Sequence, residues 1–239
     1  MLSGFARSSI NQAAYLQAKP FPHRVIDGFI EPIIAKHIAA ELKVLASDDT
    51  QAWRFPEADA HADQVLKRGL SDFKKMTPLL RMASDYFNSD SFLAYLQTLT
   101  GIQNLIADPA YVGGGYHQTG RGGKLGIHHD FNVHRIQDEL VYRRVNLLVY
   151  LNPLWETEWG GQLELWEPDL SVCQAIIEPF FNRAVIFTID DAPHGHPNRV
   201  ACPVGESRRS LAYYYYTKAE PSTDKRLTRA YWKYGAKLL

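Results

Sequence analysis

A histidine and an aspartate stand two residues apart in the stretch Gly126–Asn132, GIHHDFN, and this spacing could place two metal ligands on one side of a strand. Side chains alternate between the faces of a β-strand, so His128 and Asp130 point the same way and His129 points the other way. Two histidines and one carboxylate form a set that holds Fe(II) and leaves coordination positions open. We therefore expect His128 and Asp130 to supply two of the three ligands.

The third ligand must come from a distant part of the chain, and the segment Pro193–Pro197, PHGHP, offers two histidines. It follows the apolar run Ala184–Ile189, which we expect to be a strand. His194 and His196 are two residues apart and could share a face, so spacing alone leaves both as candidates. A lone His-x-Asp pair is often a chance match, but the glycines before it and the second histidine pair favour a metal site.

The segment Ser207–Tyr216, SRRSLAYYYY, is a candidate anion-binding strand. Arg208 and Ser210 would project together into the interior, whereas Arg209 would point the other way. A buried arginine needs an anionic partner, and its guanidinium suits a carboxylate. If no protein carboxylate lies beside Arg208, a ligand must supply one. The alternative is that Arg208 is a solvent-exposed residue at a strand end.

The elements that position these residues follow from hydrophobic periodicity. After a surface lead-in to about residue 24, we expect a short strand in 24–30 and helices over 32–45, 61–87 with a break or kink at Pro78, and 90–101 with Asp90 as N-cap. After Asp108-Pro109 the period becomes strand-like, and we expect strands near 111–117, 124–131, 143–151, 161–167, 174–178, 183–190, 197–201 and 208–217. Such short strands are typical of a double-sheet jelly roll, here with helices packed on one outer face.

The length of 239 residues is compatible with a single domain. We divide it into a helical support, 1–106, a β core, 107–218, and a tail, 219–239. Lys plus Arg equals Asp plus Glu at 26 each, so the overall charge disfavours a nucleic-acid partner without excluding a local basic patch. Two cysteines, no long apolar run and no signal-peptide pattern predict a soluble, cytoplasmic protein without a membrane partner.

From about residue 107 to 218 the chain resembles the Fe(II)- and 2-oxoglutarate-dependent oxygenases of the prolyl-4-hydroxylase-like superfamily. The resemblance is carried by Gly122–Asn132, Arg144–Asn152, Trp159–Leu165, His194 and Arg208–Leu211. It implies a double-stranded β-helix, also called a jelly-roll or cupin-like fold, buttressed by N-terminal helices. It also implies Fe(II), 2-oxoglutarate and O2 as cofactors, with ascorbate as a further candidate reductant.

The resemblance assigns roles residue by residue. The metal and catalytic residues would be His128, Asp130 and His194, with His196 left outside the ligand set; the residues for the distal carboxylate of 2-oxoglutarate would be Arg208, Ser210 and Tyr116. A carboxylate at position 130 is typical of hydroxylases, whereas halogenating relatives have a small residue there.

The implied reaction is hydroxylation of an unactivated C–H bond with release of succinate and CO2. The leading substrates are a prolyl residue in a protein or peptide and a free or carrier-bound amino acid. Segments 50–70 and 132–142 are expected to cover the site. Two alternatives remain open at this point: a zinc-dependent hydrolase or isomerase on the same barrel, which would not need Arg208, and a catalytically silent binding scaffold.

Overall fold

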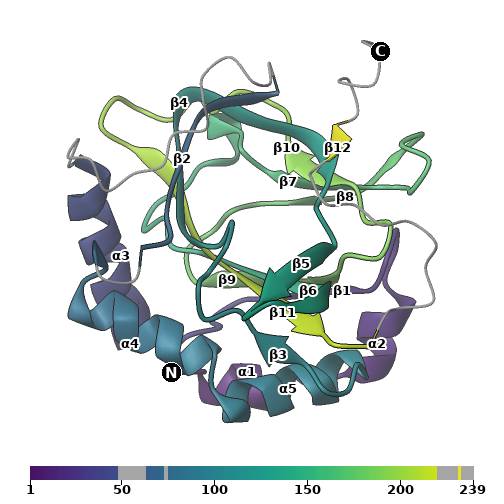
Figure 1. Ribbon diagram of the computed structural model, residues 1–239. Coiled ribbons are helices and arrows are strands. Elements are labelled where there is room, and N and C mark those ends of the chain that lie inside the picture. Colours follow the sequence, from purple (N-terminus) through teal and green to yellow (C-terminus); the bar gives the residue numbers. More distant parts are fainter. Residues whose placement is uncertain (48–62, 73–74, 220–230, 233–239) are drawn as a thin grey trace.

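The computed structural model describes residues 1–47, 63–72, 75–219 and 231–232. Its helices are α1 (Gly4–Ser8), α2 (Gln12–Gln17), α3 (Pro32–Ser47), α4 (Pro78–Phe87) and α5 (Asp90–Thr100), with a short 3-10 turn, η2 (Thr157–Trp159). Its strands are β1 (His23–Ile26), β2 (Gln64–Leu70), β3 (Ile106–Ala107), β4 (Gly115–His129), β5 (Val133–Ile136), β6 (Glu139–Tyr150), β7 (Leu163–Trp166), β8 (Cys173–Ile177), β9 (Arg183–Thr188), β10 (His194–His196), β11 (Ser207–Thr217) and β12 (Tyr231–Trp232). Figure 1 shows the helices gathered below and beside a curled sheet.

The sheet is antiparallel and follows the order β1-β9-β6-β11-β4-β10-β7-β8. The long strand β4 belongs to both halves of it: Gly115–Gly120 pair with β11, and Leu125 and His128 pair with β10. Strand β2 lies along the free side of β4. Because one strand is shared in this way, the sheet curls into two halves that face each other. The predicted fold class, a jelly roll supported by N-terminal helices, is confirmed.

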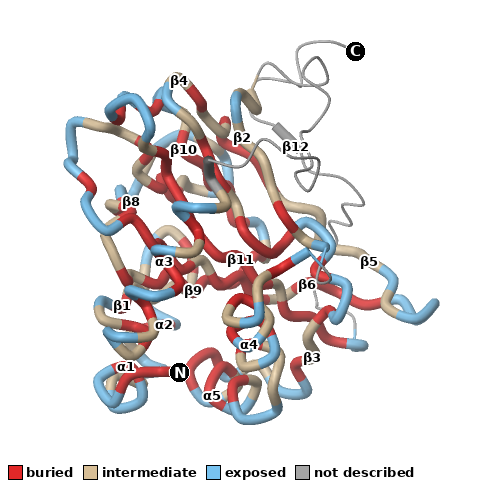
Figure 2. Tube along the Cα trace, turned by 90° about the vertical axis from the view of Figure 1, so that its left-hand side faces the viewer, coloured by how far each residue is buried: buried red, intermediate tan, exposed pale blue. Residues whose placement is uncertain are grey.

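The main core lies between the helices and the outer face of the larger half-sheet, whose strands are buried along most of their length (Figure 2). On β11, Leu211, Tyr213 and Tyr215 belong to this core, while Arg208, Ser210 and Tyr214 face a cavity between the half-sheets. The helices contribute Leu42, Leu80, Phe87, Phe92, Leu96 and Leu99 to the same core. The period of two along β11 therefore separates a structural face from a face available to a ligand.

Helix α5 has the boundaries that the sequence predicts, with one difference at its start. The residue that caps it is Ser89, whose hydroxyl accepts from the backbone N–H of Phe92, and Asp90 is the first helical residue. The helix ends at Gly101 in the left-handed conformation, φ 77°. Pro78 does not break a helix; it stands in the first turn of α4, where a missing N–H has no cost, and Thr77 caps that helix.

Two N-terminal predictions are wrong. Residues 64–70 form strand β2 instead of a helix, because pairing with β4 decides their conformation and Gly69 is a poor helix former. The lead-in to residue 24 contains α1 and α2, and Tyr15 of α2 is fully buried with its hydroxyl 2.8 Å from Thr188 Oγ1. The short strand expected in 24–30 is confirmed by β1.

Strand boundaries in the β core also differ in places. The predicted strands 111–117 and 124–131 are one strand, β4, because its internal glycines bend it without ending it. The predicted strand 197–201 is wrong: no strand is formed there, and β10 lies just before it, at His194–His196. Segment 132–142 contains β5 and the start of β6, and segment 50–62 lies outside the described residues, as does most of the tail. Within the described part of the chain, no helix is long and apolar enough to span a bilayer.

Candidate metal centre and its pocket

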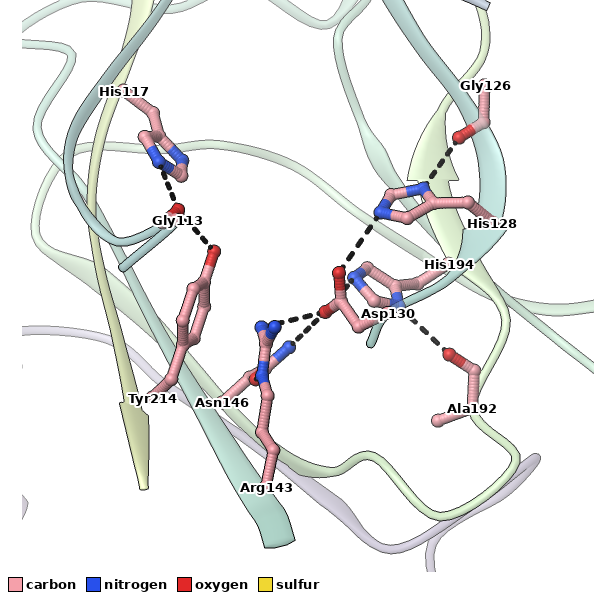
Figure 3. Close-up of polar contacts among 10 residues, drawn as sticks. All are labelled: Gly113, His117, Gly126, His128, Asp130, Arg143, Asn146, Ala192, His194 and Tyr214. Carbon is pink, nitrogen blue, oxygen red and sulfur yellow. Dashed lines mark hydrogen bonds and ion pairs between the residues drawn. The ribbon is translucent and has the colours of Figure 1, made fainter. Parts of the chain in front are cut away.

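The side chains of His128, Asp130 and His194 converge at one point on the inner face of the barrel (Figure 3). One potential ligand atom from each residue lies within 4.8 Å of the other two. Both imidazole Nε2 atoms are 3.4 Å from a carboxylate oxygen of Asp130. Strand pairing produces this convergence, because His128 of β4 is directly opposite His194 of β10. Asp130 follows the end of β4, two residues after His128.

Backbone carbonyls fix both imidazole rings. His128 Nδ1 lies 2.9 Å from the carbonyl oxygen of Gly126, and His194 Nδ1 lies 2.9 Å from that of Ala192. A carbonyl can only accept, so each Nδ1 carries the proton and each Nε2 presents a lone pair to the cluster. Burial lowers the pKa of His194 to about 4, which keeps this ring neutral near pH 7. Neutral, oriented imidazoles are the form that binds a metal ion.

The carboxylate of Asp130 is held by two residues of β6. Arg143 Nη2 donates to Oδ2 over 2.8 Å, and Asn146 Nδ2 donates to the same oxygen over 2.9 Å. Arg143 Nε also donates to Asn146 Oδ1 over 2.7 Å. Burial would raise the pKa of Asp130, but Arg143 and the imidazoles of His194 and His128 outweigh it and hold the pKa well below its usual value. Asp130 is therefore an anion in a fixed orientation.

Arg143 is itself fixed by aromatic contacts. Its guanidinium carbon lies 3.3 Å from the ring centroid of Tyr214 and 4.9 Å from that of Phe131. The Tyr214 hydroxyl donates to the carbonyl of Gly113, as Figure 3 shows. Because only 1% of Arg143 is exposed, this stacking and the bond to Asp130 together hold a buried charge in place.

The cluster forms one part of the lining of a cavity of about 320 Å³, and Arg208 forms another. Arg208 is 5% exposed, its Nε donates to the carbonyl of Gly161 over 2.7 Å, and its Nη2 donates to the hydroxyl of Tyr150 over 3.1 Å. None of the described carboxylates forms an ion pair with it. A buried guanidinium next to a cavity, without an anionic partner among these residues, fits the carboxylate of a ligand.

The structure brings most of the predicted site residues into this cavity. His128, Asp130, His194, Arg208 and Ser210 all line it. His196 lines it too, but outside the ligand cluster: its Nε2 is 3.4 Å from Thr119 Oγ1.

Tyr116 does not share this pocket. It points to the helix side of β4, where its hydroxyl donates to the carbonyl of Leu42 over 3.2 Å within the main core. Its neighbour His117 faces the cavity instead, paired on the sheet with Ser210. The residue of this part of β4 that faces the cavity is therefore His117, one position after the predicted Tyr116.

Sequence reasoning missed several residues of the pocket. Arg143 and Asn146 line the cavity and had no assigned role. Neither had Tyr150, which lies outside the lining, shares a face of β6 with Asn146 and accepts a hydrogen bond from Arg208. Lys67 was hidden because its segment was expected to be helical. His117 could have been found from the alternation of β4, once the register of that strand with Arg208 is known.

The donor set fits iron. Two neutral imidazole nitrogens and one carboxylate on one side of a cavity leave the opposite side open, which is the arrangement of non-haem Fe(II) oxygenases. The same donors suit catalytic zinc, so the ligands alone do not select the metal. Arg208 in the same cavity has no carboxylate partner among the described residues, and this distinguishes the two metals, because an anionic cosubstrate explains the buried guanidinium and a zinc-bound water does not.

Residues 114–216 match the sequence model of the 2OG-Fe(II) oxygenase superfamily. Members of this superfamily use Fe(II), 2-oxoglutarate and O2, in agreement with the predicted cofactors. No curated protein matches the chain in sequence.

Three solved structures share the fold. A Pseudomonas putida prolyl-4-hydroxylase has a TM-score of 0.55 and 16% identity, over 82% of this chain and 92% of that one. A prolyl hydroxylase from Trichoplax adhaerens, in complex with a hypoxia inducible factor peptide fragment, has a TM-score of 0.59 and 18% identity, over 89% of this chain and 91% of that one. HygX from Streptomyces hygroscopicus, with nickel, 2-oxoglutarate and hygromycin B bound, has a TM-score of 0.52 and 14% identity, over 82% of each chain.

Proposed function

We propose that this protein is a hydroxylase that oxidises an unactivated C–H bond and releases succinate and CO2, because residues 114–216 match the sequence model of the 2OG-Fe(II) oxygenase superfamily. The observation that carries the proposal is the combination, in one cavity, of a His-Asp-His cluster and a buried arginine that pairs with no carboxylate among the described residues. The cluster accounts for the metal, and the arginine accounts for the cosubstrate.

In this proposal His128, Asp130 and His194 hold Fe(II). Fe(II) and 2-oxoglutarate, when bound, supply the oxidising chemistry with O2. Arg208 binds the distal carboxylate of 2-oxoglutarate, with Ser210 lining the same part of the cavity. Tyr150 keeps the Arg208 guanidinium in position through its hydroxyl. Ascorbate as a reductant and a cytoplasmic location remain predictions.

The protein's own contribution is to orient and to exclude water. Arg143 and Asn146 fix Asp130, so the open coordination side faces the cavity. Leu125, Leu148 and Leu163 give the cavity apolar walls, which limit access of water to a reactive centre.

The substrate class proposed first is a prolyl residue in a protein or peptide, or a free or carrier-bound amino acid. Two of the structural neighbours are prolyl hydroxylases, one of them bound to a peptide, and a third holds a small molecule, hygromycin B. The aromatic ring of Phe131 lines the cavity directly after Asp130 and would contact an apolar part of such a substrate.

The test is an anaerobic titration of the metal-free protein with Fe(II) and then 2-oxoglutarate, followed through the visible metal-to-ligand charge-transfer band. The wild type is expected to develop the band, and Arg208→Ala to need a much higher 2-oxoglutarate concentration. Arg199→Ala is the matched control, because Arg199 is exposed and bonds only the carbonyl of Gly122. It should titrate like the wild type.

Three results would reject the proposal. Folded, iron-loaded protein without a band would favour zinc-dependent hydrolysis or isomerisation, and equal titration of Arg208→Ala and the wild type would point the same way. A cellular role that survives loss of the metal ligands would favour a binding scaffold.

A further inference from the structure

Lys67 brings a second cationic side chain to the wall that carries Arg208. In the sheet register Lys67 of β2 pairs with Thr119 of β4, and Thr119 pairs with Arg208 of β11. Residues paired in this way point to the same face, so these three side chains form one row across three strands. Both ends of the row, Lys67 and Arg208, line the cavity. Figure 1 shows β2 running beside β4.

Among the residues that the structure describes, Lys67 has no partner that explains its position. Among the described residues, no carboxylate forms an ion pair with its ammonium group and no acceptor bonds it, although Asp72 and Asp63 pair with Lys75 and Lys124 nearby in the chain. Burial lowers the pKa of Lys67 to about 8; Asp130 opposes this shift and Arg208 adds to it. A half-buried ammonium beside a guanidinium is unfavourable unless a ligand brings negative charge.

The charges of the loaded pocket leave Lys67 without a counterion. Asp130 compensates Arg143, with which it forms an ion pair. Under the proposed function, the distal carboxylate of 2-oxoglutarate compensates Arg208, and its other carboxylate lies at Fe(II). Two cations at opposite ends of a row, with Thr119 between them, are suited to two separate anions.

We propose that Lys67 binds a carboxylate of the substrate, and that the enzyme therefore acts on small organic acids or free amino acids in preference to uncharged compounds. This inference rests on the proposed function and narrows its substrate class. A single ammonium matches a singly charged carboxylate, and Gln64 of the same strand lines the cavity with an amide that can donate a second hydrogen bond.

The experiment uses the full chain and four proteins: wild type, Lys67→Met, Lys67→Arg and the control Lys43→Met. Lys43 is an exposed lysine, 58% by side chain, that pairs with Glu206 and does not line the cavity, so its replacement removes the same charge outside the pocket. Each protein is first titrated anaerobically with Fe(II) and 2-oxoglutarate. A missing charge-transfer band in the wild type would reject the proposed function itself, separately from the role of Lys67.

Each protein loaded with Fe(II) and 2-oxoglutarate is then titrated calorimetrically, without oxygen, with the N-acetylated common amino acids, each as the free acid and as the amide. In the wild type, we expect at least one acid to bind and its amide to bind about tenfold more weakly or worse, since a charge-assisted hydrogen bond is lost. Lys67→Met should lower the affinity for that acid by about the same factor and leave the affinity for its amide unchanged. Lys67→Arg should recover most of the affinity, and Lys43→Met should match the wild type.

Three results would overturn the assignment. If Lys67→Met weakens 2-oxoglutarate binding as much as acid binding, Lys67 serves the cosubstrate. If amides bind the wild type as well as acids do, the substrate carboxylate is not recognised. If no acid binds the loaded wild type, the pocket does not select carboxylates of this size.

Discussion

His128 and His194 stand directly opposite each other on the antiparallel strands β4 and β10, with ring centroids 4.8 Å apart. The geometry of the candidate metal centre is therefore set by how closely two backbones approach. Gly195, between the two histidines of β10, permits this approach: a Cβ there would lie 2.4 Å from the carbonyl oxygen of Gly126. With any side chain at position 195, β4 and β10 could not pair as closely as they do.

Gly195→Ala should consequently damage both the fold and the metal site. We expect a loss of about 1–3 kcal/mol in the free energy of unfolding, as for overpacking of a core, together with weaker Fe(II) binding. Chemical denaturation and anaerobic Fe(II) titration measure the two effects. Gly4→Ala is the control, because a Cβ at Gly4 meets nothing within 4 Å. Wild-type iron affinity in Gly195→Ala would contradict the role of strand spacing.

The residues that hydrogen-bond to Asp130 should affect the affinity for Fe(II) without being metal ligands themselves. Asn146→Ala removes one donor to Oδ2 and leaves Arg143 to hold the carboxylate alone. We expect Fe(II) affinity to fall by roughly 10–100-fold, the range seen when partners of metal ligands are removed. Asn198→Ala is a matched control, since Asn198 is exposed and bonds Glu164. An unchanged iron affinity in Asn146→Ala would show that Arg143 suffices.

The hydroxyl of Tyr150 should matter for the cosubstrate and not for the metal. Tyr150→Phe removes the acceptor of Arg208 Nη2 and frees the guanidinium to rotate. We expect the dissociation constant of 2-oxoglutarate to rise about tenfold, in line with loss of a hydrogen bond to a charged group. Iron binding, titrated before 2-oxoglutarate is added, should be unchanged.

Tyr213→Phe is the control for Tyr150→Phe. Tyr213 is equally buried but lies on the helix side of β11, with its hydroxyl 3.1 Å from Ser84 Oγ. This variant should lose stability and keep the 2-oxoglutarate affinity of the wild type. If both variants weaken the binding of 2-oxoglutarate equally, the cause is a general loosening of the sheet and not the loss of the contact with Arg208.

How far the sequence predicts the fold depends on whether local pattern or distant pairing decides an element. Helix α5 and strand β11 have strong patterns of their own, and both were predicted closely. The conformation of β2 is decided by its partner β4, far away in the sequence, so its local pattern was misleading.

The same distinction applies to the site. His128 and Asp130 are found from a spacing within one strand. The motif PHGHP leaves His194 and His196 both open, and only the family resemblance selects His194. Asn146 contacts Asp130 only because β6 and the end of β4 meet in a particular register, which no local spacing reveals. Lys67 shares a row with Arg208 for the same reason, because both pair with Thr119 of β4. Residues that act through tertiary register needed the structure.

Tyr116 illustrates the smallest error of this kind, because a shift of one residue along a strand moves a side chain to the other face. Its hydroxyl bonds Leu42 of α3 in the main core, so Tyr116→Phe should leave 2-oxoglutarate affinity unchanged and cost about 1 kcal/mol of unfolding free energy. His117, one residue later, faces the cavity, and His117→Trp should weaken 2-oxoglutarate binding by filling space. The charge-transfer titration and chemical denaturation, applied to both variants, measure these effects. The opposite pattern, with 2-oxoglutarate binding lost only in Tyr116→Phe, would mean that β4 presents its other face to the ligand.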